Sequence, residues 1–376
     1  METQYSSNNN NDTIESWVRI SLAEIPPGRL RPLLEAFEFH PHDLLTAGPT
    51  AWSGILAPKQ SERLDEWRKQ DIRIELDALE KAGGHIVTLR DPEYPINLRQ
   101  ISDASPILFV RGELLPDDRF SIAIVGSRRA TSYGLSIAER FAAELTGKGL
   151  CIVSGGARGI DTRAHRGALA GGGRTVAFVA CGLDVIYPAE NRSLFARIAE
   201  KGSGAVVTEF APGITPEPWR FPARNRLISG MSLGTLVVES PTDSGALITA
   251  TDAAAQGREV FAVPGPIETG RSSGCHKLIQ EGAKLVESAR DIIDELGLLT
   301  LESDDCSGET RFSPPPSNLP NEQREVLEML TLQPRLVDSM IADSPLTSAQ
   351  VVAVLTLLEM RGLARRVPGN AFVRVL

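Results

Sequence analysis

The stretch LCIVSGGARGIDTRAHRGAL, residues 150–169, places an apolar strand, a glycine turn and a helical pattern next to one another. The strand ends in Ser-Gly-Gly at residues 154–156, and Asp161 follows a second glycine where it can cap the helix. Such a turn lets backbone amides approach a phosphate group, and the helix N-terminus adds positive potential there. The glycines could equally serve close packing between strand and helix, so both interpretations stay open.

Five more apolar runs of strand length lie between residues 121 and 265. Helix-length segments separate these runs, and each segment is stopped by glycine. Continuously apolar strands that alternate with helices are typical of a parallel sheet covered by helices on both faces. We therefore predict an α/β fold with a doubly wound, mainly parallel sheet over residues 85–298.

Changes in composition divide the rest of the chain. Residues 1–14 are polar and are predicted to be a disordered tail, whereas residues 15–84 have the apolar spacing of a small helical domain. Residues 299–318 are acidic and rich in Pro and Ser, which is typical of a linker. Residues 319–376 contain three helical patterns and a hairpin that turns at 368–370, so we predict a winged helix.

Bulk composition excludes several classes of site. The 376-residue chain has a formal net charge of −9 and four widely spaced cysteines without a Cys-x-x-Cys pair. Neither a zinc site nor a disulfide framework is indicated, and the glycine spacing matches neither the dinucleotide fingerprint nor the P-loop. We expect no metal, no other cofactor and no membrane segment, and therefore a cytoplasmic protein.

Positive charge is nevertheless concentrated locally. Residues 121–170 contain seven Lys or Arg against three acids, and residues 219–230 contain three Arg and no acid. Because the carboxyl ends of parallel strands meet at one edge of a sheet, we expect the loops that carry these arginines to lie together. Arginine binds phosphate oxygens and an aromatic such as Phe221 can stack on a sugar or base, although any single arginine could instead be ion-paired.

Seven motifs carry a resemblance to a known family. They are GSRRATSYG (126–134), SGGARGIDTRAHRGAL (154–169), CGLDVIYPAENRSLF (181–195), TEFAPG (208–213), FPARNRLISGMS (221–232), VVESPTDSGALITATDAAAQGREVFAVPG (237–265) and SSGCHKLIQEGAKLV (272–286). In this order and spacing the chain resembles the DprA/Smf family over about residues 121–287. The resemblance implies an extended Rossmann-like core between a helical SAM-like domain and a winged helix.

The resemblance also implies a function. Members of this family bind single-stranded DNA, protect incoming strands during natural transformation and help to load the RecA recombinase, usually as homodimers through the core. The resemblance assigns DNA contact mainly to Arg128, to the turn at 155–156 and to the segment 224–226, without cleavage of the DNA. Together with charge and glycine placement, it gives the candidate DNA-binding residues Gly126, Ser127, Arg128, Gly155, Gly156, Arg158, Arg220, Phe221, Arg224, Asn225, Arg226, Ser244, Gly245 and Thr249.

Two catalytic alternatives have to be weighed. Asp161 and His165 share one helix face and could join Ser127 or Ser154 in acyl transfer, but no G-x-S-x-G elbow accompanies them. A nucleotide phosphoribohydrolase of the lysine decarboxylase-like type shares the glycine turns. Its P-G-G-x-G-T-x-x-E motif is missing here, and only Glu209 and Glu239 remain as candidate acids.

The predicted winged helix has two possible roles. Its third helical pattern, residues 347–361, is nearly uncharged, which suits a protein contact better than a phosphate contact. Duplex binding through Arg365 and Arg366 is the alternative.

Overall fold

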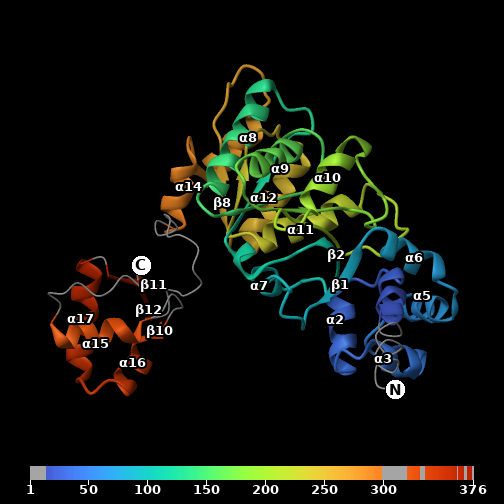
Figure 1. Cartoon of the computed structure of the whole chain (residues 1–376), viewed down its shortest axis with the longest axis horizontal. Helices are drawn as coiled ribbons and strands as arrows, with labels where there is room; N and C mark the ends of the chain where they lie inside the picture. The colour runs from blue at the N-terminus through green and yellow to red at the C-terminus, as the bar shows by residue number, and fades with distance from the viewer. Residues whose placement is uncertain (1–13, 299–319, 331–334, 362, 368–370, 375–376) are drawn as a thin grey trace. The chain divides into compact units, whose positions relative to one another are not determined.

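The computed structural model describes residues 14–298, 320–330, 335–361, 363–367 and 371–374 (Figure 1). The chain divides into two compact units, residues 1–297 and 298–376. The predicted tail up to residue 13, the predicted linker and the predicted turn at 368–370 lie outside the described residues. Among the helices that are described, none is long and apolar enough to cross a membrane.

A nine-stranded sheet in the order β1-β2-β6-β5-β4-β3-β7-β8-β9 forms the centre of the first unit. The strands are β1 (Gly84–Thr88), β2 (Ile107–Gly112), β3 (Ser121–Val125), β4 (Cys151–Ser154), β5 (Thr175–Phe178), β6 (Gly204–Thr208), β7 (Gly234–Val237), β8 (Glu259–Ala262) and β9 (Lys284–Leu285). In the order of the sheet, every neighbouring pair from β6 through β5, β4, β3, β7 and β8 to β9 is parallel. β2 pairs antiparallel with β6, and β1 pairs antiparallel with β2. The prediction of a mainly parallel, doubly wound sheet is confirmed, and β1, β2 and β9 extend it beyond the six predicted strands.

The direction in which successive strands are added to the sheet reverses at β3. From β3 the chain steps through β4 and β5 to β6, and it then returns to β7 on the other side of β3. Since crossovers between parallel strands are right-handed, the two halves place their helices on opposite faces of the sheet. The helices are α7 (Ile96–Arg99), α8 (Ser132–Thr146), α9 (Ile160–Ala170), α10 (Arg192–Ile198), α11 (Arg220–Met231), α12 (Gly245–Ala255), α13 (Ser273–Gln280) and α14 (Ala289–Glu295), with short 3₁₀ turns η1 (Pro116–Arg119) and η2 (Ala189–Asn191).

Six helical segments among the described residues come before the first strand in the sequence. Residues 14–22 are helical, and they are followed by α2 (Pro27–Ala36), α3 (Pro41–Ala47), α4 (Pro49–Trp52), α5 (Pro58–Lys69) and α6 (Arg73–Lys81). Four of these helices begin at proline, whose fixed φ suits the first helical position. Buried residues such as Trp17 and Leu33 share one hydrophobic core with Phe109 of the sheet, so helices and sheet are one packed body.

The second unit is the predicted winged helix. It contains α15 (Asn321–Met329), β10 (Arg335–Leu336), α16 (Val337–Asp343), α17 (Ser348–Met360), β11 (Ala364–Val367) and β12 (Ala371–Arg374). The three strands form an antiparallel sheet in the order β10-β12-β11. Its own core packs Val326 and Leu330 against Leu355 and Phe372.

Candidate nucleic-acid interface

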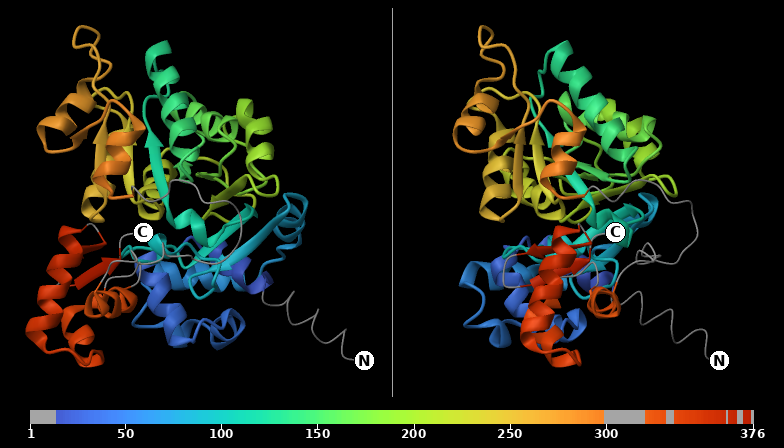
Figure 2. Two further views of the ribbon diagram at one scale, coloured as in Figure 1. Left: turned by 60° about the vertical axis from the view of Figure 1, so that its left-hand side comes forward. Right: turned by 90° about the vertical axis from the view of Figure 1, so that its left-hand side faces the viewer.

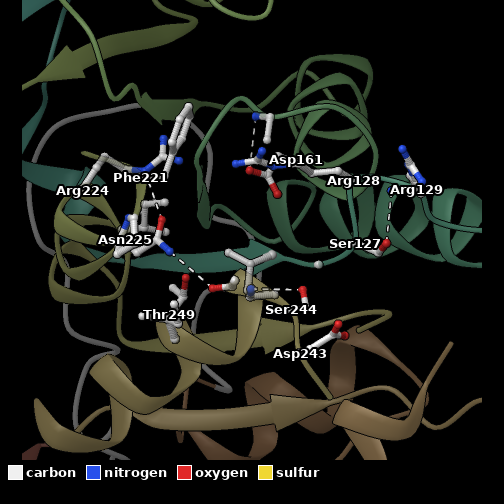
Figure 3. Close-up of a pocket in the computed structure, with 18 of the residues that line it drawn as sticks. Ser127, Arg128, Arg129, Asp161, Phe221, Arg224, Asn225, Asp243, Ser244 and Thr249 are labelled. Carbon is white, nitrogen blue, oxygen red and sulfur yellow. Dashed lines mark hydrogen bonds between the residues drawn. The ribbon is translucent and has the colours of Figure 1, made fainter. Parts of the chain in front are cut away.

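A cavity of about 850 Å³ opens at the carboxyl edge of the sheet, between β3 and β7, where the strand order reverses (Figure 3). Open α/β sheets bind ligands at such a reversal because the two neighbouring loops diverge there. The predicted residues that line this cavity are Gly126, Ser127, Arg128, Phe221, Arg224, Asn225, Ser244, Gly245 and Thr249. A second cavity of about 260 Å³ adjoins it and adds Gly155 and Arg158.

Arg128 stands at the boundary of the two cavities and lines both. Its side chain is exposed, and its guanidinium lies 4.9 Å from the centre of the Phe221 ring. The Phe221 ring in turn packs against Tyr187, with 5.6 Å between the ring centres. Within the described residues Arg128 forms no ion pair, so its positive charge faces solvent beside an aromatic surface.

The glycine turn after β4 is shaped by close approaches. A Cβ on Gly155 would lie 2.8 Å from Arg224 Nη2 and from Asp161 Oδ2. Gly159 has a φ of +80°, and a Cβ there would lie 2.3 Å from the carbonyl oxygen of Ser127. The turn therefore needs glycine in order to bring the loops after β3 and β4 together with α11.

Arg224 is a buried cation on the wall of both cavities. Its Nη1 donates to the carbonyl oxygens of Phe178 and of Gly155, the latter at 2.7 Å, and its Nε donates to Asn225 Oδ1 at 3.2 Å. Burial lowers the pKa of Arg224 to about 10, which still leaves it charged at neutral pH. These bonds hold a positive charge in a fixed position at the cavity wall.

Asp161 partly offsets this charge. It lies in the first turn of α9, where its carboxylate accepts the Ala157 N–H at 3.3 Å, and Gly159 rather than Asp161 is the N-cap. Burial raises the pKa of Asp161 to about 6, against the opposing effect of Arg224.

The residues that line the larger cavity carry a net positive charge at neutral pH. The lining contains four arginines and two carboxylates, namely Arg128, Arg129, Arg224 and Arg271 against Asp161 and Asp243.

Other predicted residues have local roles at the rim. Ser244 caps α12 by accepting the Ala246 N–H at 3.3 Å, as its position at the helix start indicates. Asn225 Nδ2 donates to the Gly245 carbonyl at 3.4 Å. Arg158 is exposed, but its Nη2 lies 2.6 Å from Glu190 Oε1, so this ion pair neutralises part of its charge.

The segment 220–231 corrects one expectation. We predicted a loop, but these residues form the helix α11, and Phe221, Arg224 and Asn225 face the cavity at three- and four-residue spacing. Arg226 comes two residues after Arg224 and therefore points elsewhere. Its Nη2 lies 2.5 Å from Glu209 Oε2, and its Nε lies 3.3 Å from Asp103 Oδ2.

Arg220 and Gly156 also line neither cavity. Arg220 is buried and contacts Glu24 at 2.7 Å, while its Nη1 donates to the Thr215 carbonyl oxygen. Residues 219–230 contain no acid, but folding brings Glu24 to Arg220 and brings Asp103 and Glu209 to Arg226, and Glu217 just before the segment also lies 3.4 Å from Arg220.

Two of the residues of the acyl-transfer alternative make other contacts. His165 is fully buried, and its Nδ1 lies 2.7 Å from Thr175 Oγ1 at the amino end of β5, away from the cavity edge. Burial lowers the pKa of His165 to about 3, and Ser154 Oγ donates to the carbonyl of Ile124 at 2.6 Å.

The two candidate acids of the phosphoribohydrolase alternative already have partners. Glu239 is buried and accepts the Thr131 N–H at 2.9 Å together with the Thr131 hydroxyl. Glu209 pairs with Arg226.

Comparison with known proteins places this site in a family. A family model described as DNA recombination-mediator protein A matches residues 85–297, and a DprA winged helix domain matches residues 310–370. Protein Smf of Escherichia coli (strain K12) is 37% identical over 320 residues, which cover 85% of each chain. The chain belongs to the DprA/Smf family.

Solved structures of the DprA/Smf family have the same fold. DNA processing protein A from Streptococcus pneumoniae is 36% identical and superimposes with a TM-score of 0.64 over 74% of this chain and 95% of that chain. DNA processing protein A from Helicobacter pylori is 29% identical, with a TM-score of 0.52 over 58% of this chain and 98% of that chain. The second structure concerns the single-stranded DNA binding mode of the Helicobacter protein.

Sequence reasoning did not consider three of the polar residues that line the larger cavity. Tyr187 follows β5, Asp243 follows β7 and Arg271 follows β8, and all three line the larger cavity. Tyr187 and Asp243 lie inside motifs that carry the family resemblance. Their position after parallel strands was the signal that could have identified all three.

Proposed function

We propose that this protein captures single-stranded DNA in the cavity at the carboxyl edge of its sheet. The observation that carries the proposal is the exposed Arg128, which stacks on Phe221 next to the buried charge of Arg224. Guanidinium groups bind phosphate oxygens, and an aromatic ring offers a surface for a sugar or base. The Helicobacter relative, whose single-stranded DNA binding mode has been described, supports the same ligand.

The proposed capture acts on the DNA backbone. Arg128 and Arg224 attract successive phosphates, and the first turn of α12 adds backbone amides and a favourable dipole at the same wall. Phe221 can stack on an unpaired base, which a single strand offers and an intact duplex does not. Recognition through phosphates and stacking depends little on base sequence.

The proposal includes no chemical step on the DNA. His165 and Glu239 are buried, Glu209 is largely buried, and all three are engaged in contacts with the protein itself, which supports a binding role over a catalytic one. In the cell we place this function in the cytoplasm, in natural transformation and homologous recombination, where the bound strand is protected.

Two partners complete the proposal. Family membership supports a homodimer formed through the Rossmann-like core and delivery of the bound strand to RecA. Analytical ultracentrifugation of the full chain should give twice the mass of the monomer. RecA should assemble faster on DNA that this protein has coated than on DNA without it, and a monomeric protein or an unchanged RecA rate would contradict these two points.

Fluorescence anisotropy with labelled oligo-dT and a matched duplex tests DNA capture. Wild-type protein should prefer the single strand, and the logarithm of its affinity should fall with the logarithm of salt by about 0.7 for each phosphate contacted. Arg128→Ala should lower the affinity by roughly tenfold or more, because it removes a charge-assisted contact. Arg290→Ala, which removes an exposed arginine on α14, is the control and should bind as wild type.

Two results would contradict DNA capture. One is the absence of binding by wild-type protein, and the other is binding that is indifferent to Arg128→Ala. In either case the release of free base from a nucleoside monophosphate should be assayed next, because the glycine turns would then be more suited to a mononucleotide.

A further inference from the structure

A further loop reaches the cavity edge, and neither the sequence nor the family resemblance assigned it to DNA. Residues 263–272 join β8 to α13 and contain Arg271, which lines the larger cavity. This loop is the gold to orange segment that projects beyond the sheet edge (Figure 2). Because β8 runs parallel to β7, its carboxyl end lies at the same edge as the loop that carries Ser244 and Gly245.

The base of this loop is firmly held. His276 Nε2 lies 2.9 Å from the Gly265 carbonyl, and the Gly274 N–H donates to the Ser240 carbonyl at 2.8 Å. Ser272 is buried so close to Gly265 that a Cβ on the glycine would lie 2.1 Å from Ser272 Oγ. The loop is therefore a fixed wall whose exposed tip, residues 266–271, faces solvent.

Arg271 connects this wall to the loop after β3. Its Nη1 donates to the carbonyl oxygen of Arg129 at 2.9 Å, which places the Arg271 guanidinium beside the loop that carries Arg128. A guanidinium has five N–H donors, and in the part of the chain that the structure describes only this one is used by the Arg271 side chain. Arg271 is exposed and pairs with no carboxylate among the same residues, so its charge and remaining donors face the cavity mouth.

We propose that Arg271 is a further phosphate-binding residue, and that a single strand in the larger cavity contacts Arg271 as well as the stacked pair of Arg128 and Phe221. The inference rests on the proposed function and deepens it by adding a second wall to the DNA path. A cation on another loop of the same cavity can neutralise a second phosphate of an extended strand while the first is held at Arg128. The hydrogen bond to the Arg129 carbonyl fixes the Arg271 guanidinium before DNA arrives, which reduces the entropy lost on binding.

Anisotropy titrations of the full chain with labelled oligo-dT over a salt series test this role. Arg271→Ala should weaken binding by about tenfold and make the salt slope shallower by about 0.7, the value for one phosphate contact. Arg271→Lys keeps the charge, so it should keep the wild-type slope with a smaller loss of affinity. Arg290→Ala is the matched control, since the Arg290 side chain is 81% exposed on α14 and, among the residues that the structure describes, pairs only with Asp294 one turn along the helix.

The salt slope separates a phosphate contact from a purely structural role. If Arg271 only holds the loop against Arg129, Arg271→Ala weakens binding without changing the slope, and the inference is wrong. Unchanged affinity and slope for Arg271→Ala overturn it as well. Arg128→Ala measured in parallel distinguishes the two proposals: binding that depends on Arg128 but not on Arg271 leaves DNA capture intact, whereas no binding by wild type removes both.

Discussion

Asp161 determines how the charge of the cavity responds to pH. Its carboxyl group is buried between Arg224 of α11 and the loop that carries Arg128, and burial raises its pKa to about 6. Between pH 7.5 and 5 this residue therefore changes from mainly ionised to mainly neutral. The arginines stay charged throughout that range, and His165 stays neutral because its pKa is lowered to about 3.

We predict that affinity for single-stranded DNA rises several-fold as the pH falls from 7.5 to 5.5, because protonation of Asp161 removes a negative charge next to the phosphates. Asp161→Asn should bind more tightly than wild type at pH 7.5 and should lose most of this pH response. Asp243→Asn is the control, since Asp243 lines the same cavity but is exposed, and it should leave the pH response in place. A wild-type affinity that is constant over this range would disprove the assignment.

The helical geometry of α11 directs its arginines to different sides of the helix. Residues three and four apart share a face, so Phe221, Arg224 and Asn225 point into the cavity. Arg226 lies on another side of the helix, where it pairs with the largely buried Glu209, and desolvation raises the pKa of that glutamate despite the pairing. The same helix thus supplies one arginine to the candidate DNA site and another to its own packing.

We predict that Arg226→Ala lowers the free energy of unfolding by about 3 kcal/mol, because it leaves the Glu209 carboxylate buried without its cation. The salt slope for single-stranded DNA should stay at the wild-type value, in contrast to Arg128→Ala. Thermal or denaturant unfolding measures the first effect, and adding Glu209→Gln should restore part of the loss. A stable Arg226→Ala protein with a shallower salt slope would instead place Arg226 in the DNA interface, as the sequence alone predicted.

In the molecule as a whole, the proposed capture site and the winged helix belong to different units. Every residue that lines the two cavities belongs to the first unit. In the second unit α17 exposes Val352 and Leu357, and its sequence contains a single charged residue, Glu359. That this unit contacts protein rather than phosphate stays a prediction, and the side chains of Arg365 and Arg366 lie outside the described residues.

We predict that a chain ending at Gly297 binds oligo-dT within about twofold of the full chain and with the same salt slope, since it keeps every proposed phosphate contact. Titration of both proteins under identical conditions, after circular dichroism has verified that the shorter chain is folded, measures this. A large loss of affinity in a folded truncated protein would mean that the second unit takes part in strand binding.

The sequence by itself determined the six central strands of the sheet, β3 to β8, together with the glycine turns and the winged helix. Each of these depends on short-range rules: apolar runs of strand length, helical spacing, and glycine where a Cβ cannot be accommodated. It also indicated Arg128 and Arg224, because both follow from position at the carboxyl edge and from family motifs. Local patterns were sufficient for these features because the interactions that create them act between near neighbours.

Only the tertiary structure decided which arginines face the cavity. Arg220 pairs with Glu24, which is 196 residues away in the sequence, and Arg226 pairs with Asp103 and Glu209. Arg271 reaches the cavity through a loop that no charge cluster marks. Whether an arginine is neutralised depends on the carboxylates that folding brings within a few ångströms, and the electrostatic attraction over that distance is set by the fold rather than by neighbours in the chain.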